Sequence, residues 1–399
     1  MQPASPKIQT GRFVPFAFGF RPFFLLAGWS ALLGIGAWMW MYGSGRGPLP
    51  GLPPQLWHGH EMLHGFVPAA IAGFMLTAVP GWTGSRGFGG PPLLLLTIAW
   101  LLGRIGFASA GVLPFYLLAI FELAFLPLVA ALIAPPLWRA RNRNRPLLLV
   151  LFVLWACDVA FLLALRAGDA ALAGTALRAT LNVVLLLITV IGGRIVPAFT
   201  GNALRGSGIE AQMPDRPLLE RAVILLMAAV LLVDAALPLG VVSGVLAAAA
   251  GLAQLLRLAG WHGLRTLRQP IVWVLHAAYA WLPLGLFLKA CYLLAGYDWA
   301  AFWMHALGAG AAATMIVAVM SRASLGHTGR PLRTHGAMAW SYALLVMAVL
   351  VRVFGPALLP AGYRVTILTA GSLWVAAFLI FVIIYTPILL RPRVDGKPG

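Results

Sequence analysis

Long apolar runs alternate with short polar connections along the whole chain. Each run has about 20 residues, the length that an α-helix needs to cross the hydrocarbon core of a bilayer. No stretch between the runs is long enough for a soluble domain. The pattern therefore predicts an all-α bundle of about twelve transmembrane helices, at roughly 22–43, 58–80, 91–110, 112–134, 146–166, 173–194, 217–237, 239–259, 270–295, 300–320, 336–356 and 364–390.

Two connections are so short that the spans on either side should form tight hairpins. Gly111 joins the third and fourth predicted spans, and Pro238 lies between the seventh and eighth. The chain is therefore predicted to be one transmembrane helical domain over residues 1–399, with a short N-terminal segment at 1–21 and a polar tail at 391–399.

The composition agrees with a membrane protein. Hydrophobic residues make up 61% of the chain and charged residues 10%, whereas soluble domains carry roughly 25% charged residues. A formal net charge of +18 would suit nucleic acid if the basic residues formed one patch, but they are dispersed between the apolar runs. We expect the chain to contact the lipid bilayer and to bind no nucleic acid.

The basic residues give the predicted orientation. When both termini and every even-numbered loop are placed on one side, the opposite side takes only Arg46, Arg166 and Arg364. The side rich in basic residues faces the cytoplasm by the positive-inside rule. Both termini are therefore predicted to be cytoplasmic.

The second predicted span opens with a cluster of ionisable residues. It begins WHGHEMLHGF at Trp57, so three histidines and a glutamate fall within eight residues. A helix turns about 100° per residue, which places His60 and His64 on one stripe, with Glu61 and His58 on the same half of the cylinder. Ionisable groups at membrane depth are costly, so we expect them to face the protein interior and to form a site.

Small residues mark another face of this span. Gly65, Ala69 and Gly73 are spaced by four residues and should give a smooth face that another helix can approach closely.

The same segment contains the H-E-x-x-H pattern of zinc proteases. In those enzymes two imidazoles, here His60 and His64, bind one metal, and the glutamate, here Glu61, acts as general base. Intramembrane proteases of this kind need a further ligand, usually the aspartate of an Asp-Gly pair, and the Asp-Gly pair here is Asp395-Gly396 in the polar tail. A protease is therefore the least favoured reading, and histidines that only form hydrogen bonds are another alternative.

Two further histidines occur singly in apolar helices. His276 lies in LHAAYAWLPLG and His305 in WMHALGAG. With His58 and His60 they offer imidazoles from three spans, as in the haem and copper sites of helical bundles. Copper and haem iron both accept neutral imidazole. A histidine that only satisfies a hydrogen bond in the core is the alternative for each.

Candidate residues on the predicted cytoplasmic side are His327, Arg194 and Arg322. His327 lies in SRASLGHTGRPL, which we expect to be a loop, and a solvated loop histidine is the alternative. Arg194 and Arg322 could hold haem propionates or could be ordinary positive-inside residues. Structural pairing or snorkelling is the favoured reading of most charged residues in or near the spans, namely Arg104, Glu122, Asp158, Arg178, Asp234, Lys289 and Arg352.

Several ordered motifs together resemble the NnrS family of bacterial membrane proteins. They are WHGHEML followed by AAIAGFMLTAVPGWTG, then GGRIVPAFTGNAL, LHAAYAWLPLG and HALGAGAAATMIVAVMSRASLGHTGRPL. The resemblance runs from FRPFF at Phe20 through the last span. It implies a twelve-span protein of the bacterial inner membrane that binds haem and copper and belongs to the nitric oxide response.

The resemblance also implies which residues act. It covers His58, His60, Glu61, His276, His305, His327 and Arg194. His64 departs from the family, which usually has an aromatic residue there, so no family role is carried onto it. The match to H-E-x-x-H therefore looks accidental.

The sequence thus predicts a haem- and copper-binding membrane protein that handles nitric oxide or relieves nitrosative stress. The predicted metal ligands are His58, His60 and His305 with His64 beside them, and Glu61 is the predicted acid–base residue. A haem of the b type is expected at His276, with His327, Arg194 and Arg322 nearby. The chain has no C-x-x-C-H motif for a c-type haem, so electrons for any turnover of nitric oxide would come from quinol in the bilayer.

A transporter of a small solute or a metal is the alternative of a different class. His and Arg side chains would then line a path through the bundle. No pair of Gly- or Pro-broken spans stands out in matching halves of the sequence, which argues against this alternative.

Overall fold

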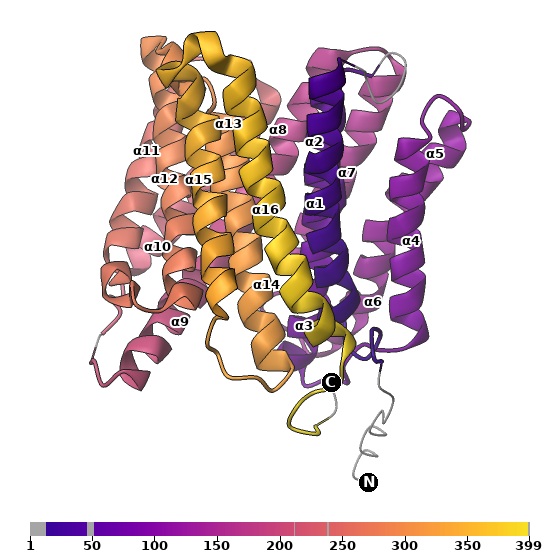
Figure 1. Cartoon of the computed structure of the whole chain (residues 1–399), viewed down its shortest axis with the longest axis vertical. Coiled ribbons are helices and arrows are strands. Elements are labelled where there is room, and N and C mark those ends of the chain that lie inside the picture. Colours follow the sequence, from indigo (N-terminus) through magenta and orange to yellow (C-terminus); the bar gives the residue numbers. More distant parts are fainter. Residues whose placement is uncertain (1–12, 46–51, 211, 238, 398–399) are drawn as a thin grey trace. The chain divides into compact units, whose positions relative to one another are not determined.

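The structure, a computed structural model, describes residues 13–45, 52–210, 212–237 and 239–397. Throughout these ranges the regular elements are helices, and no β-strand occurs in them (Figure 1). Eleven helices of the described part are long and apolar enough to cross a membrane. The predicted all-α membrane fold is therefore confirmed.

The helices form two compact units, and each is described by itself. The first unit comprises Met1–Ala170, Met320–Leu332 and Phe378–Gly399. It contains α1 (Phe20–Ser44), α2 (Pro54–His60), η1 (Glu61–Phe66), α3 (Val67–Thr83), α4 (Pro91–Ala108), α5 (Phe115–Leu123), α6 (Phe125–Arg139) and α7 (Leu147–Arg166).

The second unit comprises Ala171–Val319 and Arg333–Ala377. The boundaries between the units fall at the start of α8, within α14, in the connection before α15 and within α16. The single domain expected from the sequence stays a prediction. The remaining elements are α8 (Ala170–Leu187), η2 (Ile188–Gly192), α9 (Gly193–Gly206), α10 (Pro217–Ala236), α11 (Val241–Ala259), η3 (Gly263–Thr266), α12 (Pro270–Ala295), η4 (Asp298–Ala300), α13 (Trp303–His305), η5 (Ala306–Ala313), α14 (Thr314–His327), α15 (Gly336–Leu358), η6 (Pro360–Gly362) and α16 (Tyr363–Leu390).

Each predicted span corresponds to helical structure. The seventh predicted span is α10, a helix of 20 residues. It is not one of the eleven helices that are apolar enough to cross a membrane, because it carries Glu220, Arg221 and Asp234. The predicted hairpin at Gly111 joins α4 to α5, and its φ of 85° is a left-handed conformation that suits glycine. The predicted joint at Pro238 and the outer-side Arg46 lie outside the described residues.

Three of the long helices contain a π-helical segment. The segment η1 begins at Glu61, η2 ends two residues before Arg194, and η5 begins directly after His305. Such segments bond i to i+5 and occur frequently at functional sites. All three lie beside residues that the sequence marked as site candidates.

The small residues of the second span face more than one helix. A Cβ on Gly73 would lie 2.7 Å from the ring of Phe24 on α1, and a Cβ on Gly65 would lie 2.9 Å from Nη1 of Arg104 on α4. Close approach at these glycines is confirmed. One helix, α1, packs against both η1, which carries Gly65, and α3, which carries Gly73, and Arg104 of α4 also reaches Gly65.

The fourth predicted span is broken between α5 and α6. Pro127 has no N–H to donate to the carbonyl of Leu123 four residues earlier. That carbonyl accepts instead from Nε1 of Trp155 on α7, at 3.1 Å. The break follows Glu122 by two residues, and Glu122 is buried in the interior of the first unit.

The start of α1 and the end of α16 lie side by side in the first unit. The amide of Val14 donates to the carbonyl of Leu390 at 2.8 Å. Nη1 of the fully buried Arg21 donates to the carbonyls of Leu389 and Arg391, both at 2.7 Å. The two ends of the described chain therefore lie close together, as expected for an even number of spans. That both ends face the cytoplasm stays a prediction.

Candidate functional site

Ionisable side chains converge inside the first unit, in the cluster that we call the six-residue cluster. Five of them are buried, from His60, which is fully buried, to Glu61, which is 9% exposed, and the side chain of the sixth, Arg104, is 14% exposed. Membrane proteins place such groups inside the bundle because lipid cannot solvate them. The members are His60 at the end of α2, Glu61 and His64 in η1, Arg104 on α4, Glu122 on α5 and Asp158 on α7.

His60 is at the centre of the cluster. Its Nε2 lies 3.2 Å from Oδ1 of Asp158 and 3.6 Å from Oε1 of Glu122. The ring is stacked against Phe107 and Phe161, with centroids 3.7 and 4.7 Å away. The two aromatic rings therefore fix the imidazole with Nε2 facing both carboxylates.

Arg104 connects two carboxylates of the cluster. Its Nη1 donates to Oε1 of Glu61 at 2.7 Å, and its Nη2 donates to Oε1 of Glu122. Hydrogen bonds between a guanidinium and carboxylates are stronger than neutral ones. Arg104 thus holds Glu61 and Glu122 in place from α4.

His64 lies beside His60, as the sequence predicted. The two ring centroids are 5.1 Å apart, and Nδ1 of His64 is 3.7 Å from Oδ1 of Asp158. Nε1 of Trp100 donates to the carbonyl of Gly65 at 3.0 Å, which fastens the π segment to α4. His64 is therefore part of the cluster despite its departure from the family pattern.

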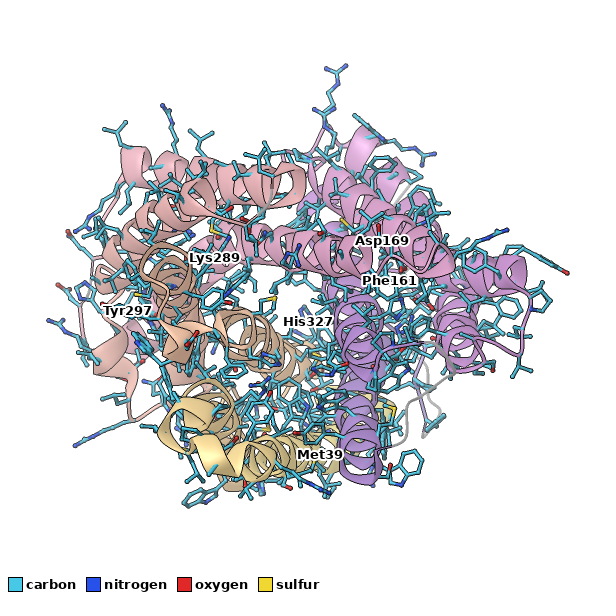
Figure 2. All side chains as sticks on the ribbon, turned by 90° about the horizontal axis from the view of Figure 1, so that it is seen from above. Met39, Phe161, Asp169, Lys289, Tyr297 and His327 are labelled. Atoms are coloured by element: carbon cyan, nitrogen blue, oxygen red, sulfur yellow. The ribbon has the colours of Figure 1, made fainter. Side chains whose placement is uncertain are left out.

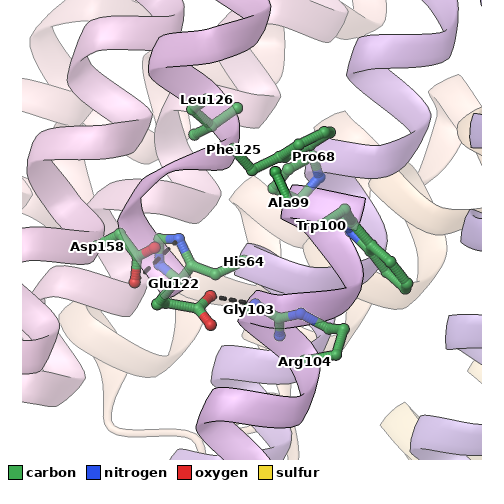
Figure 3. A pocket seen from close by; sticks show the side chains of 10 residues that line it. All are labelled: His64, Pro68, Ala99, Trp100, Gly103, Arg104, Glu122, Phe125, Leu126 and Asp158. Atoms are coloured by element: carbon green, nitrogen blue, oxygen red, sulfur yellow. Dashed lines mark hydrogen bonds and ion pairs between the residues drawn. The ribbon is translucent and has the colours of Figure 1, made fainter. Parts of the chain in front are cut away.

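A small cavity of about 10 Å³ adjoins the cluster (Figure 3). Its polar side is formed by His64, Arg104, Glu122 and Asp158, and its other side is apolar and aromatic. This volume corresponds to about one water molecule. The cavity therefore suits a single ion or a diatomic molecule and does not fit a haem.

The donor atoms of His60, Glu122 and Asp158 fit one metal ion. One ligand atom from each lies within 4.8 Å of the others. In a tetrahedral site with bonds of about 2.0–2.2 Å, neighbouring donor atoms are about 3.3–3.5 Å apart. The two separations from His60 Nε2, 3.2 and 3.6 Å, are close to this spacing. Oε2 of Glu122 is buried and makes no hydrogen bond within the described residues.

The predicted ligands His58 and His305 are not among the residues of the six-residue cluster. The ring of His58 is stacked on Trp38 of α1, with the centroids 5.0 Å apart. His305 ends α13 and belongs to the second unit. The convergence of His58, His60 and His305 on one metal stays a prediction.

Glu122 and Asp158 are site candidates that the sequence reasoning missed. It read them as structural partners, although both are acids inside apolar runs, which is the signal that could have identified them. Their pairing with His60 joins positions far apart in the chain, 98 residues in the case of Asp158. No local pattern indicates that proximity.

His276 is buried on α12, in the second unit. Its Nε2 is 2.8 Å from Oγ1 of Thr200 on α9, and Trp261 meets the ring edge-on. A Cβ on Gly263 would lie 2.5 Å from Nδ1, so only glycine allows this segment to pack against the imidazole. The haem role of His276 stays a prediction.

His327 ends the helix α14, so the expectation that it lies in a loop is wrong. The helix continues because the first breaking residues, Gly329 with φ of 73° and Pro331, come after it. The ring is 5.4 Å from that of Phe20, and its backbone carbonyl accepts from Arg393 at 2.8 Å.

The remaining candidates are divided between the units. Arg322, which is buried, and His327 belong to the first unit, whereas Arg194 and His276 belong to the second. A joint role of the four at one haem stays a prediction.

The second unit has a buried ion pair of its own. Nζ of Lys289 on α12 donates to Oδ2 of Asp234 on α10, and Nδ2 of Asn182 donates to the same oxygen at 2.9 Å. Lys289, labelled in Figure 2, is fully buried, and its ammonium lies 5.3 Å from the ring centroid of Trp303. Structural pairing, which the sequence favoured for these residues, is what the contacts indicate.

A second network supports the π segment η2. Nη1 of Arg257 donates to the carbonyl of Thr189 at 2.7 Å and to the hydroxyl of Tyr279 at 2.9 Å. Nε of Arg257 donates to Glu220 at 2.8 Å. A Cβ on Gly193 would lie 2.0 Å from the guanidinium, so glycine is needed where Arg257 crosses the helix.

The family model described as NnrS protein matches residues 14–393, which is nearly the whole chain and covers both units. The chain belongs to the NnrS family. The NnrS resemblance that the motifs predicted is therefore confirmed, and the chain is a multi-pass membrane protein of this family. A search of curated proteins found no match.

Proposed function

We propose that this NnrS protein is a metal-containing protein of the bacterial inner membrane that handles nitric oxide or protects cellular iron from it. The observation that carries the proposal is the buried group of His60, Glu122 and Asp158 within a membrane bundle of this family. Groups of this kind are rare in membrane spans and are costly to keep there. A site for a metal and a small ligand accounts for them.

The family resemblance adds haem and copper to the proposal. His58, His305 and His64 are the candidate ligands for copper. Haem would be held by His276. A porphyrin is far larger than the cavity of about 10 Å³ at the cluster, so the proposed haem belongs to the second unit.

The surroundings of the cavity suit a small ligand such as nitric oxide. The apolar wall excludes water, and the opposite wall carries His64 and Arg104, whose N–H groups can donate hydrogen bonds. A metal ion at this position would hold or polarise the ligand. Glu61, which Arg104 connects to Glu122, would supply or accept protons.

A visible spectrum and a metal analysis of the purified full-length protein test the proposal. We expect Soret absorption, bound metal and a change of the spectrum when nitric oxide is added under reducing conditions. His335→Asn is the control, because His335 caps α15 from the surface and asparagine can still cap the helix. A colourless, metal-free protein that does not respond to nitric oxide would refute the proposal.

The π segments also favour a second candidate function, a transporter of a small solute or a metal. They interrupt the spans that contain η1, η2 and η5, and transporters often build substrate sites at interrupted helices. Uptake into liposomes that contain the protein tests this candidate. Equal uptake by protein-free liposomes would exclude it.

A protease is not proposed. Glu61 is bound to Arg104. Asp395, the aspartate of the Asp-Gly pair, is bound to Arg393 in the tail.

A further inference from the structure

We propose that the six-residue cluster binds one divalent cation of the Fe(II), Mn(II) or Zn(II) class through His60, Glu122 and Asp158. Neither haem nor copper(I) suits these ligands. The inference rests on the proposed function, because it specifies the metal at the same site. Its basis is the charge of the cluster, its donor atoms, and the side chains around them.

The formal charges of the cluster do not balance. Glu61, Glu122 and Asp158 contribute three negative charges, and Arg104 contributes one positive charge. Charged or ionisable groups that act electrostatically on Glu122 include Arg104, His60, Asp158 and Glu61. With His60 neutral, as metal binding requires, and with His64 counted as neutral, the cluster has a formal charge of −2. One divalent cation neutralises it, whereas copper(I) leaves one negative charge inside the bundle.

The donor atoms favour the same class of cation. Two of the three are carboxylate oxygens, and one is an imidazole nitrogen. Copper(I) prefers thiolate and thioether ligands, whereas iron(II), manganese(II) and zinc(II) accept this mixed set. None of the described residues that line the cavity has a sulfur atom.

One of the three proposed ligands, Glu122, has an oxygen atom that no hydrogen bond within the described residues uses. Glu122 is 5% exposed and lines the cavity, and its Oε2 makes no hydrogen bond in the described part of the chain. A buried carboxylate oxygen without a partner is costly unless a cation or a proton binds it. The cavity beside it has room for one further small ligand on the metal.

The ligands are held in place by neighbouring groups, as in known metal sites. Arg104 fixes Glu122, and Oε1 of Glu61 lies 3.7 Å from Nδ1 of His60, the nitrogen that faces away from the two carboxylates. The stacked rings of Phe107 and Phe161 fix the plane of the imidazole. The site therefore needs little rearrangement to bind a cation.

Metal analysis of the full-length protein, purified from cells supplied with iron, manganese, zinc and copper, tests the proposal. We expect about one equivalent of divalent cation per chain, and a loss of affinity of about tenfold or more in Asp158→Asn and Glu122→Gln. Asp234→Asn is the matched control, since Asp234 is also a buried aspartate of a membrane helix, 2% exposed, but is paired with Lys289. The control should keep its metal.

A second measurement does not depend on the folding of a variant. Cobalt(II) added to metal-stripped wild-type protein should give the visible absorption of a low-coordinate site. Zinc(II) should abolish this absorption by competition. If cobalt(II) gives no such absorption, the inference is wrong, and two protons neutralise the cluster instead.

The outcomes separate this inference from the proposed function. Copper that is present in the wild type and lost in Asp158→Asn and Glu122→Gln would overturn the assignment to the Fe(II), Mn(II) or Zn(II) class and leave the proposed function standing. A protein with no metal at the cluster whose spectrum still responds to nitric oxide would also overturn the metal assignment and leave the proposed function standing. Protein that holds no metal and does not respond to nitric oxide would overturn both.

Discussion

Glu61 lies between two partners, and they indicate two different roles. Its Oε1 accepts from Arg104 at 2.7 Å and is 3.7 Å from Nδ1 of His60. As a partner of the imidazole it would orient a metal ligand. As a buried acid bound to Arg104, which lines the cavity, it would transfer protons. A glutamine at this position keeps the shape of the side chain and removes its negative charge, so this substitution distinguishes the two roles.

We expect Glu61→Gln to weaken metal binding by about tenfold, because His60 loses the charge that orients it. Metal content measured against wild type is the readout. Glu210→Gln, in an exposed loop of the second unit, is the control. Unchanged metal content with slower consumption of nitric oxide would instead assign proton transfer to Glu61.

For His276 we expect the alanine variant to lose or shift the haem band. The imidazole lies in a membrane helix with Thr200 as its hydrogen-bonding partner. The hydrogen bond alone is worth about 1 kcal/mol. The spectrum and the haem stoichiometry of His276→Ala are the measurements, with His335→Asn as control. If both stay unchanged, His276 is a hydrogen-bonded core residue.

Local sequence could predict part of the site but not all of it. His60, Glu61 and His64 lie within one short segment, so their convergence follows from helical geometry. The approach of Glu122 and Asp158 depends on how α5 and α7 pack against α2. Such contacts between distant segments leave no local signal.

At the scale of helices, hydrophobicity predicted the positions of the spans but not their interruptions. A π segment inserts one residue and shifts the phase of the helix. In η1 the residues EMLHGF read equally well as an α-helix, because the apolar pattern tolerates one extra position. Pro127 is visible in the sequence as a helix-breaking residue, but the donation from Trp155 to the carbonyl of Leu123 is not.

Deletion of Met62 should convert η1 to a regular α-helix. Residues before the deletion would rotate by about 100° relative to α3, which moves His60 away from Asp158. We expect the metal content to fall while circular dichroism stays helical. Deletion of Ser85, between α3 and α4, is the control. Metal binding that survives the Met62 deletion would show that the π geometry is dispensable.

Trp155→Phe should lower the stability of the protein, because it removes a hydrogen bond at the break between α5 and α6. It leaves the carbonyl of Leu123 without its donor, which costs about 1–3 kcal/mol. Thermal unfolding in detergent measures the effect, with Trp29→Phe at an exposed position of α1 as control. Adding Pro127→Ala should restore stability, because alanine supplies the missing N–H. No recovery in the double variant would contradict this account.

For the molecule as a whole, the predicted orientation remains to be measured. We expect a C-terminal fluorescent protein to fold and a C-terminal alkaline phosphatase to be inactive, because both termini are predicted to be cytoplasmic. Phosphatase fused in the loop after Arg166 should be active. The opposite pattern would reverse the assignment of every loop.

The first unit also constrains how the protein can be synthesised. It contains the first 170 residues and the last 22, so the ribosome must make the whole intervening segment before this unit can close. Arg21 and its acceptor Leu389 are 368 residues apart. At about 5–20 residues per second this interval lasts roughly 20–70 s. During that time the nascent chain already carries a charged cluster in the bilayer but not the last helix of the unit. During every round of translation, membrane insertases and proteases therefore encounter a first unit that still lacks its last helix.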